Sequence, residues 1–424
     1  MERMAIVDGI RTPFGKMGTV FNNLSAVDLG RMAARELIER TALDVNHIDE
    51  VIFGCVGQPA DVANIARVIG LLSGVPKTTP AYTVHRNCAS GIEAVVSVAL
   101  KIQSGEGRCI LAGGTESMSN IPFYYTKEAQ EIFMEASRAK TLPAKLQAFF
   151  KFRPKHFTPR IGLQMGLTDP ACGLNMGQTA EVLAKEFGIT RREQDEFSLV
   201  SHQRAIAGRA FLREEIMPVI PGPKFKEAVM DDNGPREGQT REALAKLKPF
   251  FERGTGTVTA GNSSQVTDGA CAILVMSEAR AKELGYTPLG FMRSFAFAGV
   301  EPNRMGIGPA HAIPKALKKA GMKLSDMQAV EINEAFAVQV IACLKALGSE
   351  KFAKDFGYEG YAGSIDPAKL NINGGAVALG HPVGTTGARL ILTMLKTLQR
   401  NKWNAGIVSL CIGGGQGAAV VLER

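Results

Sequence analysis

A helix, a strand and a glycine-rich turn follow one another in the same order at two distant places in the chain. In the first copy, an apolar helical stretch at 91–103 leads into a strand at 109–112 and a Gly-Gly turn. In the second copy, a helix at 386–398 leads into a strand at 407–410 and a turn at 413–415. Because a faint internal repeat indicates a duplicated unit, we expect two related halves with pseudo-symmetry.

The alternation of β-type and amphipathic helical runs predicts an α/β fold. This alternation weakens between residues 120 and 253, where charged helical pieces, prolines and loops dominate. We therefore expect an N-terminal half formed by 1–119 and 254–278, a loop domain at 120–253 inserted in it, and a C-terminal half at 279–424. The expected strands include 4–7, 51–54, 270–276 and 329–332, and the expected helices include 26–40, 88–103 and 314–320.

The composition is that of a globular protein, with 45% hydrophobic and 21% charged residues among 424. Seven cysteines without a CxxC pair indicate reduced thiols and a reducing compartment such as the cytoplasm. No apolar stretch of about 18 residues occurs, so we expect a soluble protein, or one peripheral to a membrane. The net charge of +8 favours an acidic partner. Nucleic acid is the least favoured such partner, because no nucleic-acid-binding motif is present.

Cys88 follows a strand-like segment and precedes an apolar helical stretch, so we expect its sulfur at a helix N-terminus. The partial positive charge there favours the thiolate, which is the nucleophilic form. The alternative is that Cys88 is merely a small residue in a tight strand-to-helix turn.

His381 lies in the glycine-rich segment 371–389, where the backbone can approach a ligand closely and Pro382 directs the chain onward. An imidazole in such a segment can serve as a base. A phosphate-binding loop and a structural histidine are the alternatives. The density of glycines around His381 favours the catalytic interpretation.

Cys411 closes a buried strand and is followed by the glycine turn 413–415. A second strand follows this turn, whereas a dinucleotide-binding fingerprint requires a helix there. Such glycines expose main-chain N–H groups, which a developing oxyanion requires, and Gly413 is the candidate donor. Cys411 could also be only a small buried strand residue.

Asn333 ends the strand at 329–332 and begins a helical stretch, so a helix N-cap is a plausible role for it. The other histidines lie at positions 47, 85, 156, 202 and 311 and have no spacing typical of a zinc site. We therefore expect no catalytic metal.

Six motifs together resemble those of the thiolase family, in an order and spacing far more specific than any one of them. They are Asn87-Cys-Ala-Ser-Gly91, Ala112-Gly-Gly-Thr-Glu-Ser-Met118, Thr259-Ala-Gly-Asn-Ser-Ser264, Asn333-Glu-Ala-Phe-Ala337, Gly374-Gly-Ala-Val-Ala-Leu-Gly-His-Pro382 and Cys411-Ile-Gly-Gly-Gly415. The resemblance spans Ala5 to Leu422. It implies a duplicated αβαβα fold with an inserted loop domain, assembled as homodimers or homotetramers.

The resemblance implies a CoA-dependent acyltransferase that cleaves 3-ketoacyl-CoA with CoA through an acyl-cysteine, or forms acetoacetyl-CoA from two acetyl-CoA. In this interpretation Cys88 takes the acyl group, His381 accepts its proton, and Cys411 moves the proton of the α-carbon. One oxyanion hole would consist of His381 and a water held by Asn333. The other would consist of the backbone N–H groups of Cys88 and Gly413.

The resemblance also implies coenzyme A as a substrate, with no tightly bound cofactor. The positions that match the family's pantetheine contacts are Ala260, Ser264, Met176, Ala335 and Phe336, and Met305 matches a contact at the acyl end. The CoA phosphates are a natural counterion for the basic loop domain.

Residues 137–168 contain seven Lys or Arg and no acidic residue, with leucines and phenylalanines between them. This resembles the β subunits of fatty-acid oxidation complexes, where the region contacts a membrane surface or the α subunit. We therefore hypothesise a peripheral membrane contact through 137–160 or an α-subunit partner. The alternative is that the phenylalanines pack on their own domain. The Asn333-Glu-Ala-Phe motif departs from these β subunits, which carry histidine in its first position.

Two other functions compete with this interpretation. A β-ketoacyl synthase can share the fold, but one-way decarboxylative condensation needs no second acid/base thiol such as Cys411. A non-catalytic CoA-binding scaffold would be expected to have lost Cys88, His381 or Cys411, and all three are present.

Overall fold

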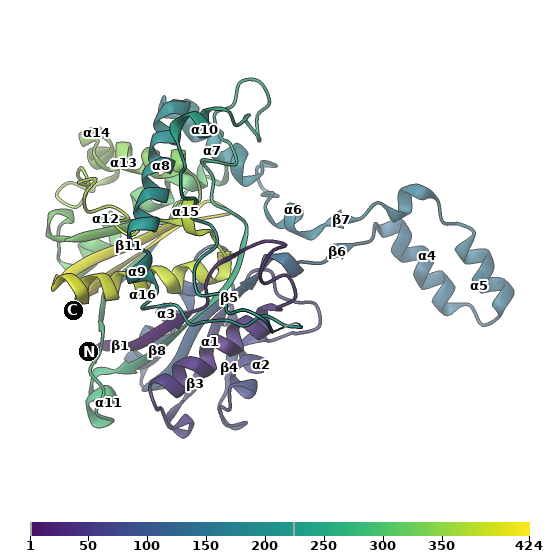
Figure 1. Ribbon diagram of the computed structural model, residues 1–424, viewed down its shortest axis with the longest axis horizontal. Helices are drawn as coiled ribbons and strands as arrows, with labels where there is room; N and C mark the ends of the chain where they lie inside the picture. The colour runs from purple at the N-terminus through teal and green to yellow at the C-terminus, as the bar shows by residue number, and fades with distance from the viewer. Residues whose placement is uncertain (1, 224) are drawn as a thin grey trace. The chain divides into compact units, whose positions relative to one another are not determined.

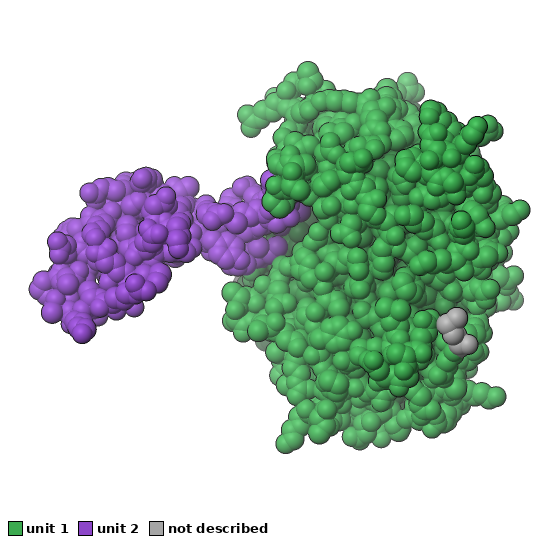
Figure 2. Space-filling view, turned by 180° about the vertical axis from the view of Figure 1, so that it is seen from behind, with its two compact units in different colours: residues 1–120, 169–424 green, residues 121–168 purple. Residues whose placement is uncertain are grey.

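The computed structural model describes residues 2–223 and 225–424, which form two compact units (Figure 2). Unit 1 comprises 1–120 and 169–424, and unit 2 comprises 121–168. Residues 169–253 of the expected loop domain thus belong to the same compact unit as both expected halves. The division into two halves and a loop domain at 120–253 stays a prediction. Within the described parts of the chain, no helix is both long and apolar enough to cross a membrane.

Unit 1 is built on a sheet with the strand order β10-β11-β12-β9-β1-β8-β5-β3-β4, to which β2 adds by pairing with β8 (Figure 1). The bounds are β1 Met4–Arg11, β2 Gly15–Lys16, β3 Glu50–Gly54, β4 Ala81–Val84, β5 Cys109–Ser117, β8 Thr267–Ser277, β9 Gly290–Gly299, β10 Ala329–Ile332, β11 Ala405–Ile412 and β12 Gln416–Glu423.

The strand pairings repeat between the two ends of the sheet. At one end β3 pairs in parallel with β5, which pairs in antiparallel fashion with β8 and then β1. At the other end β10 pairs in parallel with β11, which pairs in antiparallel fashion with β12 and then β9. Helix α3 (Ser90–Ser104) precedes β5 and helix α16 (Val383–Asn401) precedes β11. The duplicated α/β fold expected from the internal repeat is confirmed.

Three large hydrophobic cores, and a small one formed by Ala205, Phe211, Leu212, Ala378 and Leu379, hold the described part of unit 1 together. Helices α3 and α16 share one core with strands from both ends of the sheet. A second core contains α1 (Ala26–Arg40) and α2 (Ile65–Leu72), and a third contains α7 (Met176–Glu186), α12 (Gly308–Ala320) and α13 (Ala337–Leu347). The remaining helices of unit 1 are α8 Arg191–Ala207, α9 Arg209–Leu212, α10 Arg241–Ala245, α11 Glu278–Glu283, α14 Glu350–Phe356 and α15 Ala376–Leu379.

Three local expectations are wrong. Gly113 and Gly114 form no turn but lie inside β5, because they allow close packing: a Cβ on Gly113 would lie 2.2 Å from the Cys271 carbonyl oxygen. Helix α3 begins at Ser90, so Cys88 precedes the helix and lies in the turn before it. Helix α13 begins only at Ala337, so Asn333 is not its N-cap.

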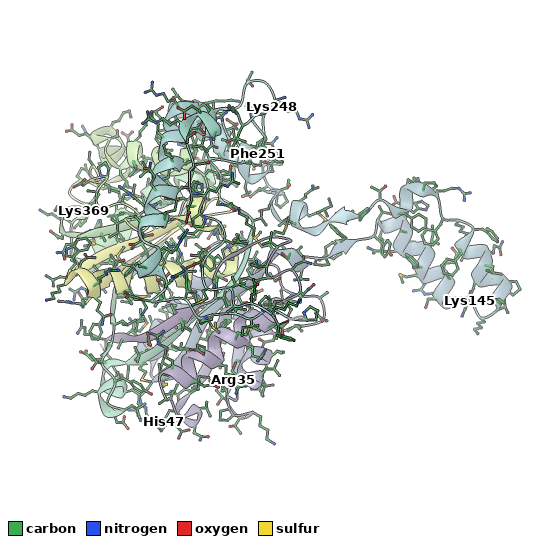
Figure 3. All side chains as sticks on the ribbon, viewed as in Figure 1. Arg35, His47, Lys145, Lys248, Phe251 and Lys369 are labelled. Atoms are coloured by element: carbon green, nitrogen blue, oxygen red, sulfur yellow. The ribbon has the colours of Figure 1, made fainter. Side chains whose placement is uncertain are left out.

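Unit 2 contains the helices α4 (Lys127–Arg138), α5 (Leu142–Phe149) and α6 (Gly162–Gly166) and a short hairpin of β6 (Phe123–Tyr124) and β7 (Arg160–Ile161). Its centre is aromatic, since the ring centroids of Phe133 and Phe152 are 4.9 Å apart. Other apolar side chains are exposed, namely those of Leu142, Leu146, Phe150 and Phe157. Basic residues such as Lys145 lie among them (Figure 3).

Candidate active site

Cys88 lies in a tight turn between β4 and α3. The side chain of Ser90 holds this turn, because its Oγ donates to the Asn87 carbonyl at 2.7 Å and accepts from the Arg86 N–H at 2.9 Å. The half-buried Cys88 thiol receives hydrogen bonds from the N–H of Gly413 and from its own N–H. Two backbone donors therefore converge on the sulfur.

The resting thiol is less acidic than the sequence suggests. Burial raises the pKa of the Cys88 thiol, although the N–H groups of Gly413 and Cys88 lower it. The expected preference for thiolate at a helix N-terminus is therefore wrong for the resting protein, because desolvation outweighs the backbone donors. Deprotonation of Cys88 needs a base.

His381 stands between α15 and α16, with its backbone N–H bonded to the Gln265 carbonyl at 3.1 Å. Its Nδ1 lies 2.6 Å from Thr386 Oγ1, and its Nε2 lies 3.4 Å from Asn333 Nδ2. The Thr386 hydroxyl donates to the Pro382 carbonyl at 3.0 Å, so it must accept from His381. We therefore assign the proton to Nδ1, so Nε2 carries a lone pair that faces the Asn333 Nδ2 amide.

The environment of His381 keeps its ring neutral. Burial, and then the charge of Arg389, lowers the pKa of His381 to about 3. A neutral imidazole with an unprotonated Nε2 is competent as a proton acceptor at physiological pH. His381 lies two residues before α16 (Val383–Asn401), the helix that packs against α3.

Cys411 is buried near the end of β11. Burial raises the pKa of the Cys411 thiol well above its ordinary value, and the neighbouring sulfurs of Cys88 and Cys343 raise it further. Cys411 therefore holds its proton close to Cys88. The structure brings together Cys88 and Cys411, which are 323 positions apart in the sequence.

The turn after Cys411 contains Gly413, Gly414 and Gly415, and the last two have φ of +89° and +81°. The Gly413 carbonyl accepts a hydrogen bond from Asn87 Nδ2 at 2.7 Å. A Cβ on Gly413 would lie 3.2 Å from the sulfur of Met176. Gly413 thus lies between the Cys88 turn and the first residue of α7.

Asn333 is held directly after β10. Its backbone N–H donates to the Ser409 carbonyl at 2.9 Å, and the side chain of Asn371 bonds both the N–H and the C=O of Ile332 at 2.9 Å. Asn333 Oδ1 is buried and has no hydrogen-bond partner among the residues that the structure describes. Such an oxygen suits a polar group that enters the site, such as a water molecule.

The residues expected to contact pantetheine form one neighbourhood. The Ser264 N–H donates to the Ala335 carbonyl at 2.9 Å, and Ser263 forms a β-bridge with Phe336. Phe336 packs edge-on against Phe251, which Figure 3 labels, with 6.0 Å between ring centroids. Cys411, Ala335, Phe336 and Met305 share one core, and Met176 packs against it. Ala260 lies at the surface beside them.

The sequence assigned no role to Thr386 or Glu116, although Glu116 lies in the motif 112–118 and Thr386 in the glycine-rich segment 371–389. The Glu116 carboxylate accepts hydrogen bonds from Gly57 at 2.7 Å, Gly384 at 2.8 Å and Val56 at 3.1 Å. Burial raises the pKa of Glu116 to about 7. Glu116 thereby connects the loop after β3 to the first turn of α16, next to His381. A buried acid within a glycine-rich strand was the available sequence signal.

Comparison with known proteins agrees with this geometry. Residues 4–279 match the thiolase N-terminal domain and residues 286–424 match the thiolase C-terminal domain. The 3-ketoacyl-CoA thiolase of Escherichia coli O1:K1 is 41% identical over 426 residues, which cover all of this chain and 97% of the relative. That of Citrobacter koseri is 42% identical with the same coverage.

Solved structures give the same result. The acetyl-CoA acetyltransferase of Bacillus anthracis superposes with a TM-score of 0.86 at 36% identity and covers 100% of this chain and 99% of its own. Human mitochondrial 3-ketoacyl-CoA thiolase in complex with CoA superposes with a TM-score of 0.84 at 35% identity, over 100% of this chain and 98% of its own.

Proposed function

Because the chain belongs to the thiolase family, as its sequence motifs predicted, we propose that it cleaves 3-ketoacyl-CoA with CoA to give acetyl-CoA and a shortened acyl-CoA. The observation that carries the proposal is that the Cys88 sulfur accepts from the N–H of Gly413 and lies close enough to Cys411 to raise the pKa of its thiol. Two thiols of different role beside an N–H donor suit a reaction that breaks a carbon–carbon bond at a carbonyl.

In the first half-reaction, Nε2 of His381 takes the Cys88 proton and the sulfur attacks the 3-keto carbonyl. The carbon–carbon bond then breaks, the acyl group stays on Cys88, and the α-carbon of the departing acetyl-CoA takes a proton from Cys411. In the second, the CoA thiol gives its proton to the Cys411 thiolate and attacks the acyl-cysteine. The bond to the Cys88 sulfur breaks, acyl-CoA leaves, and Cys88 takes its proton back from His381. Run backwards with two acetyl-CoA, the same steps form acetoacetyl-CoA, which is the alternative physiological direction.

Negative charge develops on two oxygens during this sequence. The N–H groups of Cys88 and Gly413 stabilise the oxygen of the carbonyl that Cys88 attacks. His381, together with a water on Asn333, stabilises the thioester oxygen of acetyl-CoA. The unpartnered Oδ1 of Asn333 supports this assignment, because it offers an acceptor for such a water.

Coenzyme A is the proposed substrate, bound with its pantetheine arm along Ser264, Ala260, Ala335, Phe336 and Met176, and with the acyl group toward Met305. The hydrogen bond between Ser264 and Ala335 supports this path, because it places the two motifs side by side. We also infer a reducing compartment such as the cytoplasm, since Cys88 and Cys411 must stay thiols.

The function is tested with purified protein, by following loss of 3-ketoacyl-CoA and formation of acetyl-CoA in the presence of CoA. Acetoacetyl-CoA and a long-chain 3-ketoacyl-CoA serve as parallel substrates, since their comparison gives the chain-length preference.

Cys88→Ala should abolish turnover. Cys411→Ala should still allow acylation of Cys88 by acyl-CoA, observed by mass spectrometry, but should stop thiolysis. Cys172→Ala, a change of a half-buried cysteine outside the site, is the matched control. Full thiolysis by Cys411→Ala would contradict its assigned role.

A homodimer or homotetramer is also proposed. Strand β4 lies at the end of the sheet order, and its four residues are half-buried. An unpaired edge strand is a ready site for pairing with a second copy. Light scattering during size-exclusion chromatography measures the assembly, and a monomer at micromolar concentration would contradict it.

For unit 2 we propose contact with an anionic membrane surface. Helix α5 and its C-cap carry three exposed apolar side chains, Leu142, Leu146 and Phe150. Three lysines lie close to them in the sequence, Lys140, Lys145 and Lys151. Exposed apolar side chains with flanking lysines suit binding to anionic lipid. Co-sedimentation with anionic vesicles should fall when these three apolar residues are replaced by serine. Equal pelleting would discard the membrane contact and favour the fatty-acid oxidation α subunit as the partner.

A further inference from the structure

Asn87, directly before Cys88, has an unusual backbone conformation. Its φ is +44°, in the left-handed region that few residues other than glycine and asparagine adopt. Such conformations persist only where surrounding contacts hold them, and they concentrate at functional sites. The mechanism above gives Asn87 no role.

Both the backbone and the side chain of Asn87 are engaged. Its carbonyl accepts hydrogen bonds from the N–H and the Oγ of Ser90, at 3.0 and 2.7 Å, and so helps to start α3. Its side-chain Nδ2 donates to the Gly413 carbonyl at 2.7 Å. One residue therefore joins the turn that carries the nucleophile to the turn that follows Cys411.

A second contact joins the same two turns. The Arg86 guanidinium donates to Oε1 of Gln416, the first residue of β12, at 3.3 Å. Arg86 is itself held by Glu93 at 2.6 Å and lies 4.1 Å from the ring centre of Phe297. Two neighbouring residues, Arg86 and Asn87, thus connect the Cys88 turn to both ends of the glycine turn.

The far end of the glycine turn is held by the Val300 N–H, which donates to the Gly415 carbonyl at 2.8 Å, and its near end is held by Asn87. Gly413 is followed by two glycines with positive φ, and glycine has more backbone freedom than any other residue. The direction of the Gly413 N–H therefore depends on contacts from outside the turn. Asn87 makes a side-chain hydrogen bond to the carbonyl of Gly413, the residue whose N–H donates to the Cys88 sulfur.

We propose that Asn87 is a positioning residue that holds Gly413 so that its N–H points at the Cys88 sulfur and, during turnover, at the oxyanion formed there. The first part concerns the resting protein alone, and only the second rests on the proposed function. Loss of the Asn87 amide frees the turn, so the thiolate and the oxyanion both lose a well-aimed donor.

The test compares Asn87→Gly with Asn87→Ser. Glycine accepts the left-handed conformation without strain and lacks the amide. Serine keeps a hydroxyl that is too short to reach Gly413. Lys402→Gly is the matched control, because Lys402 also has a positive φ, of +55°, but caps the far end of α16 at the surface. Thermal unfolding of each variant reports whether it is folded.

Two readouts are needed. The rate of Cys88 alkylation by iodoacetamide, followed by mass spectrometry from pH 7 to 10.5, reports the thiolate without any acyl-CoA. Both Asn87 variants should react more slowly at pH 8, with the midpoint moved to higher pH. In thiolysis of acetoacetyl-CoA, kcat of both Asn87 variants should fall by about tenfold or more, while KM changes by less than about threefold. The control Lys402→Gly should match the unmodified protein in both assays.

The outcomes separate the two proposals. Unchanged alkylation in folded Asn87→Gly and Asn87→Ser overturns the role of Asn87, whatever the enzymatic activity. If the unmodified protein shows no thiolysis while the alkylation shift is observed, the proposed function fails and the positioning of Gly413 stands. A parallel loss of melting temperature and rate in both variants, with no shift of the alkylation midpoint, shows a purely structural residue and also overturns the proposal.

Discussion

Thr386 Oγ1 lies 2.6 Å from Nδ1 of His381 and at the same time donates to the Pro382 carbonyl at 3.0 Å. The hydroxyl proton is therefore already used, and Thr386 can only accept from the ring. In the proposed mechanism this relationship leaves Nε2 as the nitrogen that accepts the Cys88 proton. The contact forms because Thr386, in the first turn of α16, lies beside His381 and Pro382 in the loop before the helix.

Replacement of Thr386 by valine should remove this restraint with little change in shape. We expect kcat for thiolysis to fall about tenfold, equivalent to about 1.4 kcal/mol, because the ring can then adopt the unproductive tautomer. Thr386→Ser keeps the hydroxyl and should stay within about threefold of the unmodified protein. Steady-state kinetics of the two variants, with KM measured separately, is the check. An unchanged kcat in Thr386→Val would show that the hydroxyl does not matter and would contradict this role.

The stability of the protein should depend on pH through His381. Its pKa in the folded protein is about 3, below the ordinary value of 6.5. As pH falls below 6.5, the unfolded chain gains a proton that the folded protein does not, so stability falls between pH 6.5 and 3. Relative to His381→Asn, the unmodified protein should lose up to about 2 kcal/mol between pH 8 and pH 5. Urea unfolding of both proteins at the two pH values measures this, and a constant difference would contradict the neutral histidine.

The crossing of α3 and α16 should not tolerate a methyl group. A Cβ on Gly387 would lie 2.4 Å from the backbone N of Ile92, and one on Gly91 would lie 2.6 Å from the backbone N of Ala388. Gly387→Ala should therefore lower the free energy of unfolding by about 1–3 kcal/mol. Gly299→Ala, where a Cβ meets nothing within 4 Å, should change it by less than about 0.5 kcal/mol. Chemical denaturation compares the two, and equal effects would argue against the close crossing.

The cysteines should differ in reactivity in a defined order. Cys88 is half-buried and has two N–H donors, whereas Cys411 is buried with a thiol pKa well above the ordinary value. At pH 8 iodoacetamide should therefore label Cys88 at least about tenfold faster than Cys411. Peptide mass spectrometry over time gives both rates in one experiment. Faster labelling of Cys411 would contradict the arrangement of the two thiols.

Much of the fold was predictable because its signals are local. The expected helix at 26–40 has the bounds of α1, where Ser25 and Asp28 form a capping box, and the expected strand at 329–332 has those of β10. The two glycines of β5 led to a wrong prediction of a turn. Gly113 and Gly114 read as a turn, yet Gly114 is needed where the strand passes Gly384, whose carbonyl oxygen would be 2.1 Å from a Cβ.

Asn333 shows the same limit at the site. From the sequence it could cap a helix, but Glu334 directly after it is drawn into bonds with Ser201 at 2.6 Å and Asn371 at 2.8 Å, and the helix starts only at Ala337. Those partners lie far away in the chain, so no local pattern contains them.

The sequence by itself determined the duplicated α/β architecture and pointed to the candidate reactive side chains, because periodicity, glycine turns and motif spacing are properties of short segments. Only the tertiary structure decided the proton position on His381, the raised pKa of Cys88 and the contact of Asn87 with Gly413. Burial and hydrogen-bond geometry depend on segments hundreds of residues apart, and these meet only after the two halves have packed together.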